Sequence, residues 1–389
     1  MSGIEILFLV LAFLNFLLAA GLCATVLAGA RTVRHLRDSP PLSDSEAPSL
    51  SVVIPARNEA GQIGPALSSV LAQDYPGLEV LVVDDRSSDG TGEILDRMAR
   101  DRGGLRVLHV TGLPPGWMGK NHALQAGADA ARGEFLLFTD ADVHFAPDAL
   151  RNAMAFAAER RLDHLAVSPE LVARTLPLRG VLGVFAFVFA AYLRPWKARD
   201  PQSACSVGLG AFNLVRASAY RAAGGHGPIR MRPDDDVRLG RLLKRSGARQ
   251  ELALGRGFVS VAWYPDLCSM ARGLLKNSFA LVEYRAGLQL AAAAGTLLTQ
   301  VFPFLAPLLP VGPARWVYLA AALLLALGSA VHAPRHGLPA WSGLAYPFAM
   351  AFFVGTGLAS MATVLRDGGV VWRGTLYSLV ELKSLRSES

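Results

Sequence analysis

The chain has 389 residues, of which 52% are hydrophobic and 18% are charged, with a formal net charge of +7. Charged residues usually reach about 25% in soluble proteins, so this composition excludes an ordinary soluble protein. A basic chain can bind nucleic acid, but arginines beside an anionic lipid surface account for this charge without such a partner.

The first predicted element is a membrane helix over residues 1–30, which contain the apolar run "IEILFLVLAFLNFLLAAGLCATVLAGA". This run exceeds the roughly 20 residues needed to cross a bilayer. Its basic flank, Arg31, Arg34 and Arg37, follows the apolar run, whereas a cleaved signal peptide has its basic residues in front. The flank also predicts that the next part of the chain lies in the cytoplasm.

Residues 31–48 are rich in proline and serine and are predicted to form a linker, followed by one domain over residues 49–285. Short β-branched runs alternate there with helical patterns at residues 62–73, 91–102, 121–132 and 147–159. The expected strands are "SLSVVIPA", "LEVLVVDD", "LRVLHV", "EFLLFTDAD" and "HLAVSPE". This alternation predicts an α/β domain with a mainly parallel sheet.

Polar groups follow three of the expected strands, in "PARNE" (residues 55–59), "DDRS" (residues 84–87) and "DAD" (residues 140–142). Because ligands of open parallel sheets bind beyond the carboxyl ends of the strands, we expect these groups to share one site. No G-x-G-x-x-G follows the first strand and no Walker lysine motif is present, which argues against a dinucleotide or P-loop site.

Two adjacent aspartates, Asp84 and Asp85, end the second strand, and the following "SSDG" has turn and helix-capping residues. A carboxylate at this position can accept a hydrogen bond from a nucleobase N–H or a ribose hydroxyl. In "GWMGKNHALQAG", Lys120 lies at the start of a helix, where backbone N–H groups favour anions. A basic residue on a solvated loop is the alternative for Lys120.

Asp140 and Asp142 end the fourth strand with only Ala141 between them. In an extended chain they point the same way, and two such carboxylates repel by roughly 1–4 kcal/mol. A bound Mg²⁺ or Mn²⁺ removes that repulsion and leaves ligand positions for a diphosphate. The alternative is an acidic turn.

Three later stretches complete the domain. "GVLGVFAFVFAAYL" (residues 180–193) is apolar but too short to span, and suits a core helix or an interfacial helix beside an acceptor groove. "VGLGAFNLVR" (residues 207–216) suits close approach by a substrate or an ordinary buried strand. Asp234, Asp235 and Asp236 precede a helix, and three acids exceed what capping needs; we assign Asp236 as general base, assisted by Asp235.

Apolar stretches at residues 287–309, 316–331 and 338–365 predict a membrane region over residues 286–366, before a basic tail at residues 367–389. The first contains Pro303 and Pro307 and is followed directly by Pro310, as in a kinked or re-entrant segment. One plus three full spans would put the tail outside, although Arg366, Arg373, Lys383 and Arg386 favour the inside. One of the segments is therefore expected not to cross.

Three cysteines, Cys23, Cys205 and Cys268, have neither metal-site spacing nor an even number, which fits a reducing compartment without disulfides.

The ordered motifs "SVVIPARNE", "VVDDRSSDGT", "ALQAGADAARGEFLLFTDAD", "GAFNLVR" and "DDDVRLGRLL" resemble a family 2 glycosyltransferase domain of the GT-A fold. The resemblance covers residues 50–257 and implies a nucleotide-sugar donor, a divalent metal and inversion at the anomeric carbon. It assigns the nucleoside to Pro55, Arg57, Glu59 and Asp85. It further implies that Lys120 lies near the donor, that Asp140 and Asp142 contact donor and metal, and that Asp236 is the base. This chain has Asp235 where the family usually has glutamate.

The motifs "GWMGKNHAL", "FTDADVHF", "AAGGH" and "GGVVWRGTLYSL" are similar to membrane glycosyltransferases of carotenoid and hopanoid pathways, of the diaponeurosporenoate glycosyltransferase type. Processive polysaccharide synthases carry Q-x-x-R-W after the base. The corresponding "CSMARGLLKNSF" lacks the glutamine and tryptophan but keeps Arg272, which could neutralise the departing diphosphate.

The sequence thus predicts a multi-pass membrane glycosyltransferase with a cytoplasmic domain. It is expected to move one sugar from a nucleotide sugar to a hydroxyl or carboxyl group of a lipid, and a UDP-sugar is the first candidate for the donor. The apolar 180–193 segment and the C-terminal helices would admit the lipid. Two alternatives remain: a polysaccharide synthase or polyprenyl-phosphate sugar transferase, and a membrane scaffold that binds nucleotide sugars without turnover. The presence of Asp140, Asp142 and Asp236 argues against the scaffold, because a protein without turnover need not keep all three acids.

Overall fold

The computed structural model describes residues 2–372 and 375–384, which divide into two compact units. The sheet unit comprises residues 33–171 and 195–263, and the helical unit comprises residues 1–32, 172–194 and 264–384. The predicted linker groups with the sheet unit, whereas residues 172–194 and 264–285 group with the helical unit. The chain therefore leaves the sheet unit after residue 171 and returns to it at residue 195.

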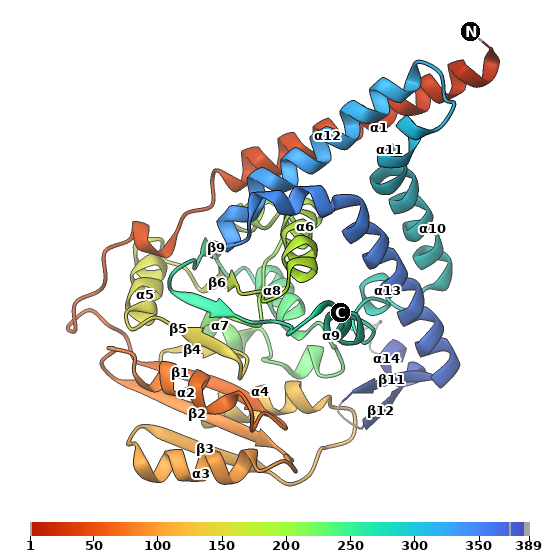
Figure 1. Cartoon of the computed structure of the whole chain (residues 1–389). Coiled ribbons are helices and arrows are strands. Elements are labelled where there is room, and N and C mark those ends of the chain that lie inside the picture. The colour runs from red at the N-terminus through yellow and green to blue at the C-terminus, as the bar shows by residue number, and fades with distance from the viewer. Residues whose placement is uncertain (1, 373–374, 385–389) are drawn as a thin grey trace. The chain divides into compact units, whose positions relative to one another are not determined.

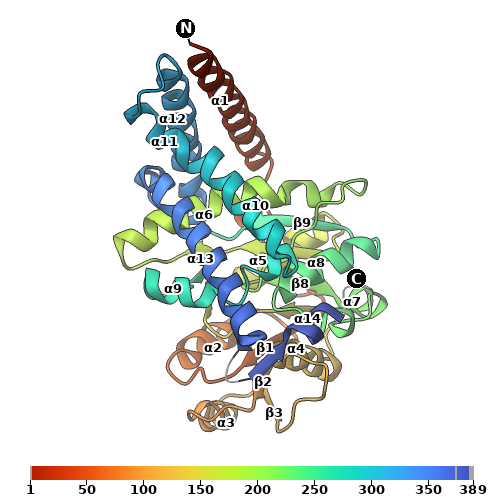
Figure 2. The ribbon, with the colours of Figure 1, turned by 90° about the vertical axis from the view of Figure 1, so that its right-hand side faces the viewer.

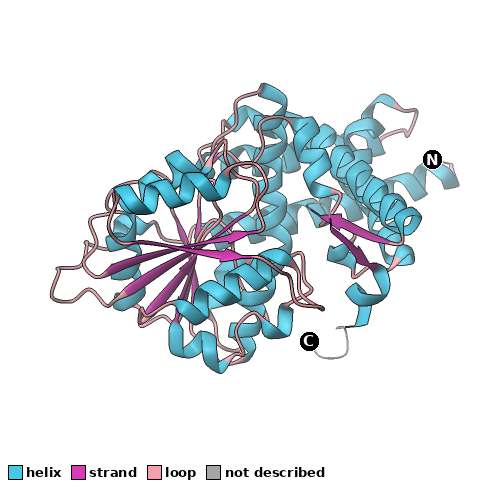
Figure 3. Ribbon diagram, turned by 90° about the horizontal axis from the view of Figure 1, so that it is seen from below, coloured by secondary structure: helices cyan, strands magenta, loops and turns pink. Residues whose placement is uncertain are grey.

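A seven-stranded sheet in the order β3-β2-β1-β4-β8-β6-β9 forms the centre of the sheet unit (Figure 3). All neighbouring pairs are parallel except the two that involve β8. The strands are β1 (Leu50–Ala56), β2 (Leu78–Asp85), β3 (Leu105–Val110), β4 (Phe135–Phe138), β6 (His164–Ser168), β8 (Asn213–Arg216) and β9 (Gln250–Leu254). The predicted mainly parallel α/β sheet is confirmed, with β8 as an antiparallel insertion.

Alternate side chains of β1 enter different cores, because successive side chains of a strand point to opposite faces. Val52 and Ile54 pack with α2 (Ile63–Leu71), α3 (Thr91–Asp101) and α5 (Ala149–Glu159). Val53 packs with α4 (Gly119–Ala130), α7 (Ala217–Ala222) and α8 (Asp235–Arg245). Helices therefore cover both faces of the sheet, and the carboxyl ends of β1, β2 and β4 lie at one edge.

Smaller elements complete the sheet unit. A second sheet has the order β5-β10-β7 and contains β5 (Val143–Phe145), β7 (Glu170–Leu171) and β10 (Val259–Val261). The segment predicted as a linker includes the short helix η1 (Leu36–Asp38), whose Leu36 is fully buried, and the 3-10 helix η2 (Pro195–Arg199) follows the return from the helical unit.

Within the described residues, five helices are long and apolar enough to cross a membrane. Their ranges are Gly3–Ala30, Leu176–Arg199, Ala286–Leu308, Ala314–His336 and Ala340–Asp367. The second contains α6 (Leu176–Leu193), which is longer than the predicted 180–193 segment because the helix begins at the Leu-Pro pair before it. By length and composition, the expectation that this segment is too short to span is therefore wrong.

Helices α1 (Gly3–Ala30) and α12 (Ala314–His332) lie side by side and run in the same direction (Figure 1). Glu5 lies beside Gly312, the Cys23 thiol lies 3.2 Å from the Leu324 carbonyl oxygen, and Arg335 Nη1 donates to the Ala30 carbonyl at 3.0 Å. The C-terminal ends of both helices therefore lie at the end where the chain passes from Thr32 into the sheet unit.

Helices α10 (Ala286–Thr296) and α13 (Tyr346–Asp367) run in opposite directions (Figure 2). Tyr346 donates to Gln300 at 2.6 Å, and the Ser360 hydroxyl accepts from the Phe279 N–H at 3.1 Å. Gln300 lies in a π-helical turn, Leu297–Val301, between α10 and α11 (Phe302–Leu305). Helix α13 therefore begins beside the second half of the Ala286–Leu308 span.

The segment between α12 and α13 turns back along α12. After the short helix η7 (Ala333–His336), the helix η8 (Ala340–Ala345) packs against α12, and Gly343 approaches Ala330. Beyond α13, the described chain forms the strands β11 (Gly369–Trp372) and β12 (Thr375–Ser378) and the helix α14 (Leu379–Ser384). Arg373 and Arg386 of the predicted tail lie outside the described residues.

Candidate active site

A lysine joins two carboxylates where β4, α4 and α8 meet. Lys120 Nζ lies 2.8 Å from Asp140 Oδ1 and 3.2 Å from Asp235 Oδ2. Lys120 lies in the first turn of α4, Asp235 in the first turn of α8, and Asp140 two residues after β4. The ammonium is therefore the counter-ion of both acids, and three segments that are far apart in the sequence meet at one point.

Burial and charge act on this cluster in opposite directions. Burial alone would lower the pKa of Lys120, but the carboxylates of Asp140, Asp235 and Asp236 together raise it. Burial raises the pKa of Asp235 to about 7, reinforced by Asp236 and Asp140 and opposed by Lys120. Lys120 thus remains charged, and the pKa of Asp235 lies well above the ordinary value for an aspartate.

Asp236 is held by two backbone N–H groups. Its Oδ2 accepts from Gly210 at 2.7 Å and its Oδ1 accepts from Val237 at 2.8 Å. Burial raises the pKa of Asp236, while Lys120 and the two N–H groups oppose that rise. A side chain at Gly210 would place its Cβ 2.6 Å from Asp140 Oδ2 and 3.4 Å from Asp236 Oδ2. The glycine therefore lets both carboxylates approach the same backbone.

These groups line a pocket inside the sheet unit. Its polar wall contains Lys120, Asp140, Asp235 and Asp236, and its apolar wall contains Leu124, Phe138 and Leu239. Thr139, Gly210, Asn213 and His226 complete the lining. The predicted Lys120, Asp140, Asp235 and Asp236 are therefore brought together, although they come from three separate motifs.

Asp142 and Asp140 lie in a turn between β4 and β5, and not in an extended strand as predicted. The alternation of a strand therefore does not bring their carboxylates together. Burial, followed by the charges of Asp140 and Glu59, nevertheless raises the pKa of Asp142 to about 7. A cation beside Asp142 would offset both effects.

Within residues 2–372 and 375–384, no group of three or more His, Cys, Asp or Glu side chains is arranged to hold a metal ion. The carboxylates of Asp140 and Asp142 still fit a hard cation that takes its other ligands from a diphosphate and water, the usual arrangement for Mg²⁺. A bound cation would oppose both causes of the raised pKa of Asp142, first its burial and then the charges of Asp140 and Glu59, which supports that fit.

The predicted nucleoside residues form a second cluster at the ends of β1 and β2. Arg57 Nη1 lies 3.5 Å from Asp85 Oδ2, and Arg86 Nε lies 2.8 Å from Asp85 Oδ1. Pro55 is paired in register with Val83 of β2. Glu59 lies in the following loop, where its N–H donates to Thr91. Arg57 and Asp85 are thus directly paired, and Arg86 is a partner that the sequence motifs did not single out.

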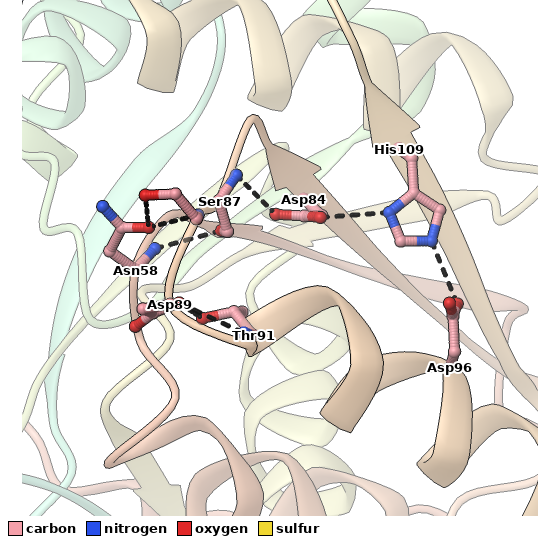
Figure 4. A network of polar contacts seen from close by, with 8 residues as sticks. Asn58, Asp84, Ser87, Asp89, Thr91, Asp96 and His109 are labelled. Atoms are coloured by element: carbon pink, nitrogen blue, oxygen red, sulfur yellow. Dashed lines mark hydrogen bonds and ion pairs between the residues drawn. The ribbon is translucent and has the colours of Figure 1, made fainter.

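Asp84 points to the opposite face of β2 from Asp85 and contacts protein groups with both oxygens (Figure 4). Its Oδ1 accepts from the Ser87 N–H at 3.2 Å, and its Oδ2 lies 3.0 Å from His109 Nδ1. The other ring nitrogen of His109 lies 3.0 Å from Asp96. The structure therefore does not bring Asp84 to the pocket, and donor binding by Asp84 stays a prediction.

The same network ties together the loops after β1 and β2 (Figure 4). The Asn58 N–H donates to Ser87 Oγ at 3.0 Å, and Asn58 Oδ1 accepts from the Ser88 N–H at 2.8 Å. Asp89 accepts from the Ala60 N–H at 3.1 Å. Asn58 has a positive φ of 55°, which asparagine tolerates better than most residues. These bonds hold the loop that carries Arg57 and Glu59 against the loop that follows Asp85.

Asn121 holds the segment that leads into α8. Its side-chain amide is fully buried and donates to the carbonyls of Ile229, Arg230 and Arg232 at 2.8, 3.1 and 3.0 Å. Asp234, the first of the three acids, pairs with Arg232 and Arg238 and does not line the pocket. Asp234 is therefore the N-cap residue of α8 by position, but its side chain forms ion pairs and makes no capping hydrogen bond.

The sequence analysis missed three functional candidates: Asn121, Asn213 and His226. A signal was available for each, since Asn213 is a polar residue inside the apolar "GAFNLV", His226 follows a glycine pair, and Asn121 adjoins Lys120. Arg272 lies in the helical unit on α9 (Leu267–Leu274), where it donates to Ser269 at 3.4 Å. Its contact with a diphosphate stays a prediction.

Three comparisons with known proteins bear on this site. Residues 51–178 match the sequence profile described as "Glycosyl transferase family 2". Two proteins named 4,4'-diaponeurosporenoate glycosyltransferase, from Staphylococcus aureus strains bovine RF122 / ET3-1 and USA300, are each 31% identical, over 182 and 181 residues. Each alignment covers 46% of this chain and 46% of the relative, so the chain spans about half the length of the curated relatives it matches.

The third comparison concerns the fold. A mannosyltransferase from Pyrobaculum calidifontis, solved in complex with GDP-Man and Mn²⁺, superimposes with a TM-score of 0.55 at 20% identity. The superposition covers 91% of this chain and 99% of that protein. This likeness confirms the predicted GT-A fold of the α/β domain.

Proposed function

We propose that this chain, which carries a family 2 glycosyl transferase domain at residues 51–178, transfers a single sugar from a nucleotide sugar to a lipid. The observation that carries the proposal is the meeting of Lys120, Asp140, Asp235 and Asp236 around one pocket. We take Asp236 as the base, Lys120 as the cation and Asp140 as the residue that contacts the donor, all around one reacting centre.

The proposed reaction is a direct displacement that inverts the anomeric carbon. The acceptor oxygen bonds to that carbon, the bond from carbon to the diphosphate oxygen breaks, and the acceptor proton passes to Asp236. Asp236 is oriented by the Gly210 and Val237 N–H groups, which leave its carboxylate at the pocket. An acceptor carboxylate has no proton to lose, and Asp236 would then orient it.

The leaving diphosphate needs positive charge close to it. Lys120 supplies one charge, since its ammonium remains protonated beside three carboxylates. A divalent ion held by Asp140 and Asp142, Mg²⁺ or Mn²⁺, would supply Lewis-acid stabilisation of the same oxygens. The chain's own contribution is to hold these carboxylates and Lys120 around one position.

The nucleoside is proposed to lie beside the Arg57–Asp85 pair and Glu59, with Pro55 at the strand end. A buried carboxylate that already accepts from Arg57 and Arg86 keeps lone pairs for a base N–H or a ribose hydroxyl. We propose a UDP-sugar as donor.

The acceptor is proposed to be a membrane lipid, such as a carotenoid or another isoprenoid. Two observations support it: the five apolar helices, and the resemblance to proteins named for a carotenoid acid. We further propose that the sheet unit lies in the cytoplasm, that residues 286–366 form a membrane region, and that residues 367–389 form a basic tail.

The test follows release of UDP from UDP-glucose by protein in detergent, with Mn²⁺ and with or without a lipid extract. Lipid-dependent release that is lost in Asp140→Ala supports the proposal, and loss in Asp236→Ala as well indicates an acceptor hydroxyl. Release lost in Asp140→Ala but kept in Asp236→Ala indicates an acceptor carboxylate. Binding without lipid-dependent release in any variant would favour a non-catalytic scaffold.

A further inference from the structure

Asn213 and His226 place polar atoms in the pocket that the proposed chemistry does not use. Both side chains are about 98% buried, at 2% and 1% exposure, and both line the pocket with Lys120 and Asp236. Polar atoms that line a pocket favour a polar group as its occupant.

The amide of Asn213 is fixed in one orientation. Its Oδ1 accepts from His164 Nε2 at 2.8 Å and lies 3.4 Å from the Leu209 N–H donor. Because both neighbours donate to the oxygen, the other amide atom, Nδ2, is the one directed away from them. Among the described residues, no hydrogen-bond partner is found for Nδ2, which leaves its two N–H groups for the pocket.

The ring of His226 is fixed in a similar way. Its Nδ1 lies 2.6 Å from the Tyr220 hydroxyl, and its backbone N–H donates to Gln125 at 2.8 Å. Phe138 packs edge-on against the ring at 5.2 Å between centroids. Burial, followed by the charge of Lys120, lowers the pKa of His226 to about 3, so the ring is neutral. Its Nε2 is the ring nitrogen that remains for the pocket.

The apolar wall decides what kind of group can enter. Leu124, Phe138 and Leu239 belong to the buried core between the sheet and the α4–α8 layer, so the pocket closes behind Asn213 and His226. A lipid tail cannot pass through this wall. The free space has room for a group of about the size of a water molecule, so one hydroxyl of a sugar can enter it beside Asn213 and His226.

We propose that Asn213 and His226 bind a hydroxyl group of the donor sugar and thereby contribute to the choice of sugar. A hydroxyl both donates and accepts, so it pairs with the Asn213 N–H groups and with Nε2 of a neutral histidine in either tautomer. This inference rests on the proposed function, since it takes a nucleotide sugar as the ligand of the pocket.

The experiment compares equilibrium binding of UDP-glucose and of UDP by full-length protein in detergent with Mn²⁺, using calorimetry. GDP-mannose and GDP are the second pair, used if the wild type does not bind the first. The variants are Asn213→Ser and His226→Phe, and the control is Asn152→Ser, an equally buried asparagine whose amide bonds within its own helix.

We expect each pocket variant to bind the nucleotide sugar roughly three- to tenfold more weakly, the loss of about one hydrogen bond, and to bind the nucleoside diphosphate unchanged. The control should change neither affinity. A variant that fails to fold would lose binding of both ligands, so the result is read from the ratio of the two affinities. If one variant does not fold, the other still tests the inference.

Unchanged ratios in both variants would overturn the inference while leaving the proposed function intact. Equal weakening of the sugar nucleotide and the free diphosphate would also overturn it, since the effect would then lie outside the sugar. A wild type that binds the nucleoside diphosphates but no nucleotide sugar contradicts the proposed function itself, and the inference with it.

Discussion

At the scale of single residues, the site depends on buried polar side chains that join separate segments of the chain. Asn121 illustrates this, because its amide joins the first turn of α4, which carries Lys120, to the segment that precedes Asp235 and Asp236. A buried amide that donates to three carbonyl groups therefore helps to fix the distance from Lys120 to Asp235 and Asp236.

Asn121→Ala should lower stability, because it leaves three buried carbonyls with fewer donors, at about 1–3 kcal/mol for each group left unsatisfied. Thermal unfolding in detergent, followed by tryptophan fluorescence, measures this. Asn152→Ala is the matched control, since its amide bonds only to Asp148 in the preceding turn. Equal losses of stability in the two variants would argue against a special role for the hydrogen bonds of Asn121.

His109 should give the protein a stability term that depends on pH. Its hydrogen bonds to Asp96, then Asp84, raise its pKa above the ordinary value of 6.5. A raised histidine pKa stabilises the folded state below the unfolded pKa, and this contribution is lost as pH rises through the folded pKa. The effect should be modest, because the ring is 42% exposed.

Unfolding midpoints of wild type and His109→Gln, compared from about pH 5.5 to about pH 9, measure this term. The wild type should be more stable at the acidic end, and the difference should shrink as pH rises. A difference that does not depend on pH would mean that His109 acts through packing alone.

The site residues could be predicted from sequence only where a motif marks a strand end or a helix start. Lys120, Asp140, Asp235 and Asp236 lie at such positions, and the fold brings them together. Asn213 and His226 could not be placed, because their contacts to His164 and Tyr220 depend on tertiary packing. The strand alternation proposed for Asp140 and Asp142 was wrong, because the strand ends earlier, at Phe138.

At the scale of elements, α6 shows how small residues allow close packing in the helical unit. A Cβ at Gly180 would lie 2.8 Å from Ala345, and one at Gly183 would overlap the Ser342 side chain. Helix α6 therefore lies against η8 along a glycine face. The sequence predicted an apolar segment here, but it could not identify the face, because glycine and alanine occur along its whole length.

Gly183→Leu should separate α6 from η8 and lower the unfolding midpoint in detergent, since overpacking costs about 1–3 kcal/mol. The control is Gly355→Leu on α13, where nothing lies within 4 Å of the added Cβ. A Gly183 variant as stable as the control would contradict this packing.

At the scale of the whole molecule, chain connectivity limits which apolar segments cross the bilayer. Strands β6 and β8 are hydrogen-bonded neighbours, and α6 lies between them in the sequence. If the sheet unit lies on one side of the membrane, both ends of α6 must be on that side, so we expect α6 not to form a single crossing. Its length and composition alone would have suggested the opposite.

The same reasoning applies to the η8–α13 segment. It leaves the end of α12 that lies beside Ala30 and turns back along α12. It then returns through α13 toward Phe279, near the start of α10. We therefore expect three crossings, formed by α1, the Ala286–Leu308 span and α12. This removes the conflict between an even number of crossings and the basic residues of the tail.

The tail should therefore lie on the same side of the membrane as the sheet unit. A cysteine at Glu381, introduced after Cys23, Cys205 and Cys268 are replaced by serine, should react with an impermeant maleimide only in inside-out vesicles. A cysteine at Ser2 should react only in right-side-out vesicles. Labelling of both positions from the same side would contradict this topology.

The central claim is that the pocket around Lys120, Asp140 and Asp236 moves a sugar onto a lipid. The most direct measurement is the transfer of radiolabelled glucose from UDP-glucose into the lipid fraction of membranes containing this chain, with Mn²⁺ present. We expect label in the lipid with wild type and a loss of at least about 100-fold in Asp140→Asn, the usual scale for removing electrostatic stabilisation of a transition state. Label in the lipid that is equal in wild type and Asp140→Asn would contradict the account.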